Sequence, residues 1–251
     1  MKQSTKVLGL AIAFCGVSAL SQADLLSQLY NTGVDNSGMK LSTASPTVDT
    51  HYTLVSSPSG YTAAFGVSGF QTGDPWQWLP SSVDYTDPNG DVFTSEWISP
   101  IWTDSGEAGN VGNYLFPQYF NYTESVDLGS ASSAVITGEW MADNGNAIDG
   151  SIITQILVNG QATGETIVTS PVDNGWGAFQ QWHPFTLSGS YFTSGVNDIT
   201  FSVVNWPQGQ GNPTGLRVVF TSANAVPEPF AFGLAALGLG LVRVVRRRRA
   251  R

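Results

Sequence analysis

Short runs in which apolar and polar residues alternate constrain this chain more than any other feature. The run NDITFSVV at 197–204 sets Ile, Phe and Val against Thr and Ser, and the run GLRVVFT at 215–221 sets Arg217 opposite three apolar residues. Successive side chains of a strand point to opposite faces, so these runs predict strands with one buried face. Clusters of Gly, Pro and Asn separate the runs, which is typical of strands joined by turns.

The same pattern recurs along the whole middle of the chain, where no fixed repeat and no Ser/Pro-rich linker divides it. We therefore expect a single all-β domain over residues 24–225, folded as an antiparallel jelly-roll β-sandwich. Ten strands are predicted: Thr50–Val55, Tyr61–Ser68, Glu96–Ile101, Asn113–Thr123, Ala134–Ala142, Ser151–Val158, Glu165–Thr169, Gln181–Leu187, Asn197–Val204 and Gly215–Thr221.

Charge is sparse in this domain and almost entirely negative. Of the chain's 10 basic residues only Lys40 and Arg217 lie within 24–225, against eighteen of its 19 acidic residues, so the segment carries a formal charge of −16. A body of this charge repels phosphate backbones, which argues against a nucleic-acid partner. Divalent cations and neutral sugars are compatible with it.

The first 23 residues read as a secretory signal peptide. Lys2 and Lys6 form a basic start, an apolar run covers 7–19, and Ser-Gln-Ala at 21–23 predicts cleavage before Asp24. Export through the Sec translocon follows from this interpretation. A buried or membrane-spanning helix and a lipoprotein anchor at Cys15, the only cysteine, are the alternatives.

The last 26 residues, 226–251, have three parts. Pro227 and Pro229 flank Glu228 and keep this stretch out of helix and sheet, because proline fixes φ and lacks an N–H donor. An apolar segment at 230–245 predicts one transmembrane helix, which overlaps an Arg-rich tail at 243–251 that would stay in the cytoplasm. The predicted stop-transfer residues are Arg243, Arg246, Arg247, Arg248 and Arg249, with Arg251 closing the chain. A core helix ending in a solvated basic tail is the alternative.

Val226-Pro227-Glu228-Pro229, a short apolar helix and a terminal arginine cluster together resemble the PEP-CTERM sorting signal of Gram-negative bacteria. Tails that resemble it are also labelled ice-binding protein C-terminal domains, a label that implies no ice binding for this chain. The resemblance implies that exosortase recognises these four residues as substrate, after transient anchoring in the inner membrane. It implies a final place on the cell surface or in the extracellular matrix, in exopolysaccharide or biofilm.

The half of the chain from Ala134 onward contains VNG, FTL, GVNDITF and NPTGLRV, in that order. These motifs resemble galactose-binding-like jelly-roll sandwiches, which often precede PEP-CTERM tails. The resemblance implies the fold; jelly rolls serve as sugar binders, enzyme accessories and structural modules alike, so it leaves function open.

One cluster of side-chain oxygens suggests a cation site. Asp87, Asn89 and Asp91 stand at alternate positions, with Asp84 or Glu96 in reserve, and such spacing can point several oxygens at Ca²⁺. A Pro-Asn-Gly hairpin turn with solvated acids is the alternative. Structural Ca²⁺ is the only cofactor that the sequence suggests, and Asp35 with Asn36 is a second candidate place for it.

Eight tryptophans invite a search for a sugar-binding surface, because an exposed indole stacks on the apolar face of a sugar ring. Trp76, Trp78 and Trp176 lie in turn-like surroundings and are the candidates; packing over an end of the sandwich is the alternative for all three. Trp97, Trp140 and Trp182 lie in strand patterns and are expected in the core.

No motif for catalysis accompanies these features. His51 and His183 are far apart in the sequence, and neither belongs to a metal-binding or nucleophile motif. We therefore expect a non-enzymatic surface or matrix protein that binds polysaccharide. A secreted glycoside hydrolase using a carboxylate pair is the alternative, since the sequence alone does not show which carboxylates lie together.

Overall fold

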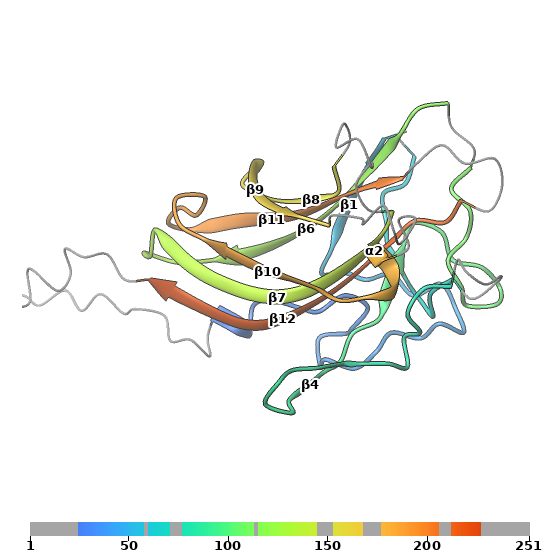
Figure 1. Ribbon diagram of the computed structural model, residues 1–251, viewed down its shortest axis with the longest axis horizontal. Coiled ribbons are helices and arrows are strands. Elements are labelled where there is room, and N and C mark those ends of the chain that lie inside the picture. Colours follow the sequence, from blue (N-terminus) through green and yellow to red (C-terminus); the bar gives the residue numbers. More distant parts are fainter. Residues whose placement is uncertain are drawn as a thin grey trace, which may run out of the picture. The chain divides into compact units, whose positions relative to one another are not determined.

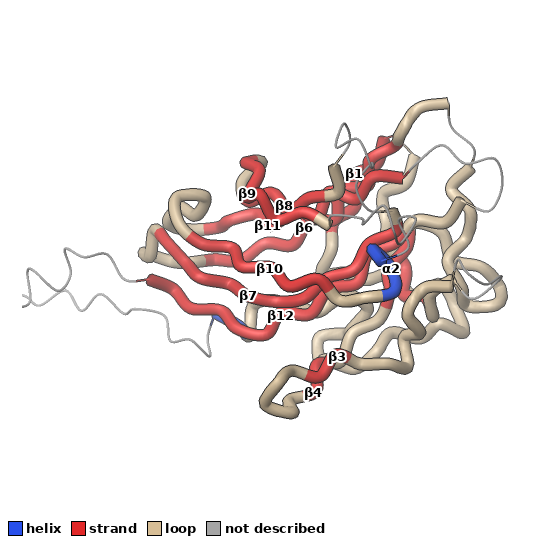
Figure 2. The backbone as a smooth tube through the Cα atoms, in the orientation of Figure 1, coloured by secondary structure: helices blue, strands red, loops and turns tan. Residues whose placement is uncertain are grey.

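The computed structural model describes residues 25–57, 60–70, 77–112, 115–144, 153–167, 177–205 and 212–226, all within one compact unit. Within these ranges the chain forms twelve strands and the four-residue helix α2 (Gly177–Gln180), and Leu25 and Leu26 are helical as well (Figure 2). The predicted signal peptide and the sorting tail from Pro227 onward lie outside the described residues. No described helix is long and apolar enough to cross a bilayer.

The strands form two five-stranded sheets in which every pairing is antiparallel (Figure 1). The first sheet consists, in spatial order, of β1 (Thr53–Ser57), β6 (Gln118–Asp127), β11 (Val196–Asn205), β8 (Gln155–Val158) and β9 (Gln161–Thr166). The second consists of β10 (His183–Ser188), β7 (Ser133–Asp143), β12 (Gly215–Val226), β5 (Trp97–Ser99) and β2 (Phe65–Val67).

Aromatic side chains from both sheets meet between them. Phe201 of β11 lies 5.7 Å from Trp140 of β7, 5.9 Å from Phe185 of β10 and 6.3 Å from Phe220 of β12, measured between ring centroids. All four side chains are buried, as the alternation in their strands predicts. The two sheets therefore pack face to face as a β-sandwich, which confirms the predicted all-β antiparallel fold.

Each of the ten predicted strands contains or overlaps an observed one, and β12 runs on to Val226, the first residue of the predicted sorting motif. The finer jelly-roll classification stays a prediction. Two strands were not predicted: β3 (Tyr85–Thr86) and β4 (Val92–Phe93), which form a separate hairpin. In Figure 1 this hairpin, labelled β4, lies below the second sheet.

Loop segments cover the outer face of the second sheet. The N-terminal segment follows β12, because the Thr32 N–H donates to the Val218 carbonyl at 3.1 Å and the Val218 N–H donates to the Thr32 hydroxyl at 2.9 Å. This segment therefore lies along the edge of β12, since the N–H and C=O groups of a strand point within the plane of its sheet. The outer face is covered at Arg217 by the segment 80–83 and Ser95, so the start of β12 is buried on both faces. Trp78 lies on the outer side: a Cβ added to Gly215 would meet its ring at 2.5 Å.

Candidate functional site

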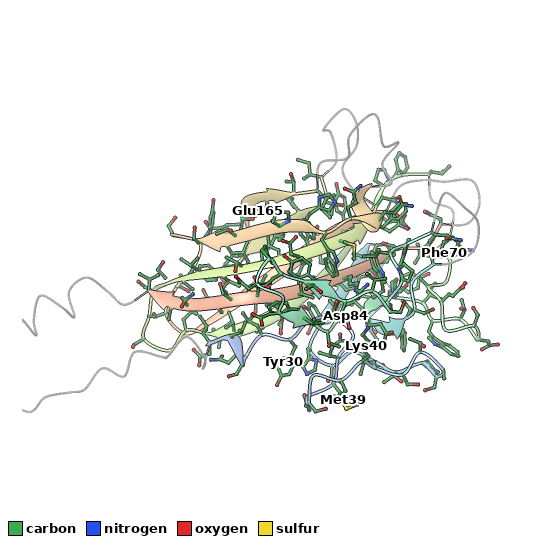
Figure 3. The ribbon with its side chains drawn as sticks, turned by 60° about the horizontal axis from the view of Figure 1, so that its bottom comes forward. Tyr30, Met39, Lys40, Phe70, Asp84 and Glu165 are labelled. Carbon is green, nitrogen blue, oxygen red and sulfur yellow. The ribbon has the colours of Figure 1, made fainter. Side chains whose placement is uncertain are left out.

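The only two basic residues of the segment 24–225 meet at one loop on this covered face. Lys40 pairs with Asp84 at 2.8 Å, and the Arg217 guanidinium lies 3.6 Å from the same carboxylate oxygen. Figure 3 labels Lys40 and Asp84 on the same side of the molecule, away from Glu165 on the first sheet. Residues 177 positions apart in the sequence thus hold one loop, the segment 80–84.

Arg217 is fully buried and serves as the internal support of that loop. Its guanidinium donates to the carbonyl oxygens of Pro80 at 3.1 Å, Val83 at 2.9 Å and Ser95 at 3.0 Å. Its charge also lies 5.1 Å from the ring centroid of Trp182. Burial lowers the pKa of Arg217 to about 10 in spite of Asp84 and Glu96, so the group stays charged at neutral pH.

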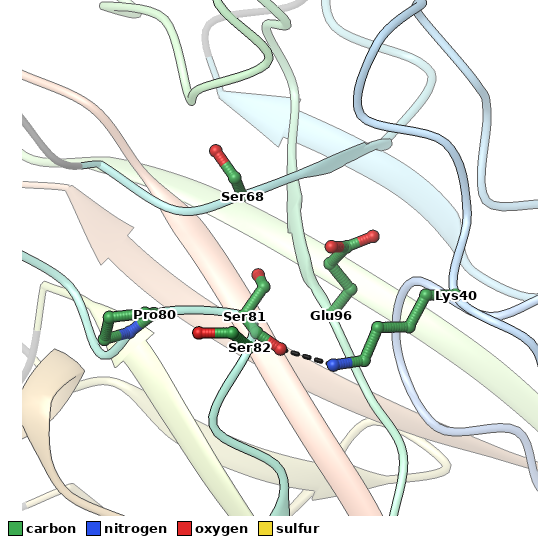
Figure 4. Close-up of a pocket in the computed structure, with 6 residues that line it drawn as sticks. All are labelled: Lys40, Ser68, Pro80, Ser81, Ser82 and Glu96. Atoms are coloured by element: carbon green, nitrogen blue, oxygen red, sulfur yellow. Dashed lines mark hydrogen bonds between the residues drawn. The ribbon is translucent and has the colours of Figure 1, made fainter.

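A pocket of about 340 Å³ opens beside this support (Figure 4). It is lined by Lys40, Ser68, Pro80, Ser81, Ser82 and Glu96. In Figure 4 the serines and Pro80 lie on one side of the pocket and Lys40 and Glu96 on the other, and the Lys40 ammonium donates to the Ser81 carbonyl oxygen. A cavity of this size suits a small polar ligand such as one sugar unit, since ligand pockets begin at about 300 Å³.

Glu96 is the acidic member of the pocket, and it is 6% exposed. Its Oε2 atom is buried without a hydrogen-bond partner among the described residues. Burial raises the pKa of Glu96 to about 7, and Asp84 adds to the rise, whereas Lys40 and Arg217 oppose it. The carboxyl group therefore changes charge close to neutral pH.

The sequence analysis did not select Lys40, Arg217 or Ser81 as site residues. A signal for the first two was present, because they are the only bases in 24–225. Glu96 entered only as a reserve calcium ligand next to Asp87. Nothing in the local sequence indicates that Ser68 and the segment 80–82 line the same pocket.

Residues Asp87–Asp91 form the turn of the β3–β4 hairpin, as the alternative to the calcium site predicts. The Asp87 carboxylate accepts hydrogen bonds from the N–H groups of Asn89 and Asp91, both at 2.9 Å. These bonds lower the pKa of Asp87. Asp84 instead pairs with Lys40. Across the described residues no group of three His, Cys, Asp or Glu side chains is placed to hold a metal ion. Calcium binding at this turn stays a prediction.

The Asp35 carboxylate is used in the same local way. It accepts hydrogen bonds from the Ser37 N–H at 2.8 Å and the Met39 N–H at 3.0 Å. The Asn36 amide oxygen lies 2.9 Å from His51 Nε2. His51 itself stacks on Tyr30 with ring centroids 3.7 Å apart. These contacts give Asp35, Asn36 and His51 structural partners within the N-terminal segment.

The prediction that Trp78 stacks on a sugar is wrong, because the side chain is 1% exposed. Its ring lies 4.4 Å from Trp97, and its Nε1 donates to the Asp143 carboxylate at 2.9 Å. The turn-like sequence around it folds back over the sheet. Trp97 and Trp140 are in the core as predicted, and Trp182 is partly buried against it. Trp76 and Trp176 lie outside the described residues.

No family model matches this chain, and no curated protein sequence matches it. Among solved structures, it is similar to the native structure of a family 35 carbohydrate binding module from Clostridium thermocellum, with 13% identity over 73% of this chain and 100% of that one and a TM-score of 0.31. It is also similar to a family 35 carbohydrate binding module from an environmental isolate, with 18% identity, 49% and 84% coverage and a TM-score of 0.23. Likenesses this distant carry no conclusion about family or ligand.

Proposed function

We propose that this chain is an exported, non-enzymatic protein of the cell surface or extracellular matrix that binds polysaccharide. The observation that carries the binding part is the pocket of about 340 Å³ between Lys40 and Glu96. A sugar unit offers hydroxyl groups that both donate and accept hydrogen bonds. The lining supplies the Ser82 hydroxyl and the Glu96 carboxyl group. The hydroxyls of Ser68 and Ser81 already donate to the carbonyl oxygens of Gly106 and Val67, so they can only accept from a ligand.

The non-enzymatic part is supported by the small number of acids at the pocket. Glycoside hydrolases use two carboxyl groups that flank the scissile bond. Glu96 is the single carboxyl group among the lining residues that the structure describes. Catalysis by a carboxylate pair would therefore need a second acid from outside this lining.

Export and sorting rest on the two ends of the chain. The basic and apolar start at 1–23 supports passage through the Sec translocon. The motif 226–229, the apolar segment 230–245 and the arginine tail support recognition by exosortase after transient anchoring in the inner membrane. In this proposal the mature protein joins the exopolysaccharide or biofilm of a Gram-negative bacterium.

A glycan array with the purified full-length chain tests the binding part. We expect retention on at least one polysaccharide without release of reducing sugar. Ser82 lines the pocket and is exposed, so Ser82→Trp fills the pocket and should weaken binding about tenfold or more. Ser190, exposed in the turn after β10, gives the matched control Ser190→Trp. Trp76→Ala and Trp176→Ala test the two remaining stacking candidates.

Release of reducing sugar from the array would contradict the non-enzymatic part and favour the glycoside hydrolase. Binding that Ser82→Trp leaves unchanged would remove the pocket from the proposal. The sorting part is tested separately, by locating the protein in cells with and without an exosortase. The same location in both would contradict it.

A further inference from the structure

Two hydrogen bonds hold the backbone of Glu96 beside Thr32. The Glu96 N–H donates to the Thr32 carbonyl at 2.8 Å, and the Thr32 hydroxyl donates to the Glu96 carbonyl at 2.7 Å. Gly33 has φ of +65°, and a Cβ there would lie 2.6 Å from the Glu96 Cβ. Only glycine fits at position 33, so its backbone lies directly against Glu96, and the Glu96 side chain lines the pocket from there.

One oxygen of the Glu96 carboxyl group lacks a partner. Its Oε2 atom is buried without a hydrogen-bond partner among the described residues, and the side chain lines the pocket. A buried acceptor left unsatisfied costs free energy, which a ligand donor can recover. An ionised carboxylate only accepts hydrogen bonds, and it has two oxygens with which to do so. Donors in a ligand are therefore what this wall of the pocket favours.

The charges around Glu96 balance one another, so the pocket can accept a neutral ligand with hydrogen-bond donors. Lys40, from the segment before β1, is paired with Asp84, and Arg217 of β12 lies buried behind them on the covered face. With Glu96 ionised, these two cations and two anions cancel. The surrounding domain carries −16, so a negatively charged ligand meets repulsion at long range and no unpaired cation in the pocket.

We infer that Glu96 determines the ligand class of this pocket, by accepting hydrogen bonds from two adjacent hydroxyl groups of a neutral sugar unit. The inference rests on the proposed function and assigns the selecting group to it. Hydrogen bonds to a charged acceptor are about twice as strong as neutral ones, so the ionised carboxylate binds such a ligand better than the acid does.

A pH dependence follows from that preference. The pKa of Glu96 in the free protein is raised to about 7, so the fraction of protein with an ionised carboxylate increases as pH rises through that value. Affinity for a neutral sugar should therefore rise with pH and level off above about pH 8, falling by up to about tenfold for each unit below pH 7. A sugar that carries its own carboxylate would show the reverse, since it would bind best beside the protonated acid.

Titration calorimetry on the full-length chain between pH 5 and 8 tests the inference. The probes are oligosaccharides of mannose, galactose, glucose and xylose, with oligosaccharides of galacturonate as the charged counterpart of galactose. We expect a neutral oligosaccharide to bind more tightly at pH 8 than at pH 6. Glu96→Gln keeps the shape but not the charge, and should weaken binding at pH 8 about tenfold or more and flatten the pH profile. Glu165→Gln, on β9 of the other sheet, is the control and should leave both unchanged.

Neutral binding that is independent of pH, or that Glu96→Gln leaves intact, would overturn the inference while the proposed function stands. Tighter binding of galacturonate that weakens as pH rises would overturn it too. If no oligosaccharide binds the folded chain, both the inference and the pocket part of the proposed function fail. The pH profile of the unmodified protein decides the question even if Glu96→Gln does not fold.

Discussion

The two sheets of the sandwich use their outer faces differently. On the first sheet the outer residues of β6 and β11 form polar pairs that reach solvent. The Thr123 and Thr200 hydroxyls share a hydrogen bond at 2.8 Å, and the Ser125 hydroxyl donates to the Asp198 carboxylate at 2.7 Å. On the second sheet the outer residues of β12 are buried, Arg217 among them. The candidate pocket lies on the covered side, which shows that a site here is built by the loops that cover a strand.

Arg217→Met should have the largest effect, because it removes the internal support of the covered face. The carbonyls of Pro80, Val83 and Ser95 lose their donor while still buried, so we expect the free energy of unfolding to fall by about 3–5 kcal/mol. Thr200→Val on the open face should cost less than about 1 kcal/mol. Urea denaturation of both variants measures the difference, and equal losses would mean that the two faces do not differ as described.

The stability of the covered face should also depend on pH. Burial raises the pKa of Asp143 and of Glu96, both on the covered face, to about 7. Glu124, on the buried side of β6 in the first sheet, acts in the same direction, because burial raises its pKa well above the usual range. Unfolded carboxyl groups titrate near pH 4, so between about pH 4 and 7 the folded protein binds more protons than the unfolded chain. Stability is therefore greatest at the acidic end of this window and falls as pH rises through 7.

We expect the free energy of unfolding to be about 2–4 kcal/mol lower at pH 8 than at pH 5, since one unit of pKa shift corresponds to about 1.4 kcal/mol. Denaturation curves at the two pH values measure it. Asp143→Asn should flatten this slope, because Asp143 is 4% exposed, whereas Asp198→Asn on the open face should not. A protein more stable at pH 8 than at pH 5 would contradict the assignment.

The difference between the faces also explains what the sequence could predict. Alternation is a local signal, and it marked the strands of both sheets because each strand has one face in the shared core, as Phe201 and Phe220 do. It also placed Arg217 opposite the apolar residues of its strand. What covers that face is decided by the segment 80–95, more than 120 positions away, and no local pattern records such a contact.

The sequence did not predict the candidate site, because contacts between distant segments form it. The wrong prediction for Trp78 has the same cause. Turn-like neighbours made Trp78 resemble an exposed ring, yet the segment around it folds onto the second sheet, where Asp143 accepts its N–H. The clearest long-range signal was charge. Lys40 and Arg217 are the only basic residues in 24–225, a segment with eighteen acidic ones, so ion pairs with carboxylates are expected for both. Both lie beside the Asp84 carboxylate.

The β3–β4 hairpin lies outside both sheets and should show the smallest effect. Because the N–H groups of Asn89 and Asp91 already bond the Asp87 carboxylate, the turn is complete without a cation. We expect the melting temperature to be unchanged, within about 1 °C, when a chelator removes divalent ions, and Asp91→Asn to cost less than about 0.5 kcal/mol. Thermal denaturation with chelator and with added Ca²⁺ measures both. A rise in melting temperature on adding Ca²⁺ that Asp91→Asn abolishes would instead establish calcium at the turn. The cation would then stabilise the hairpin, which belongs to neither five-stranded sheet.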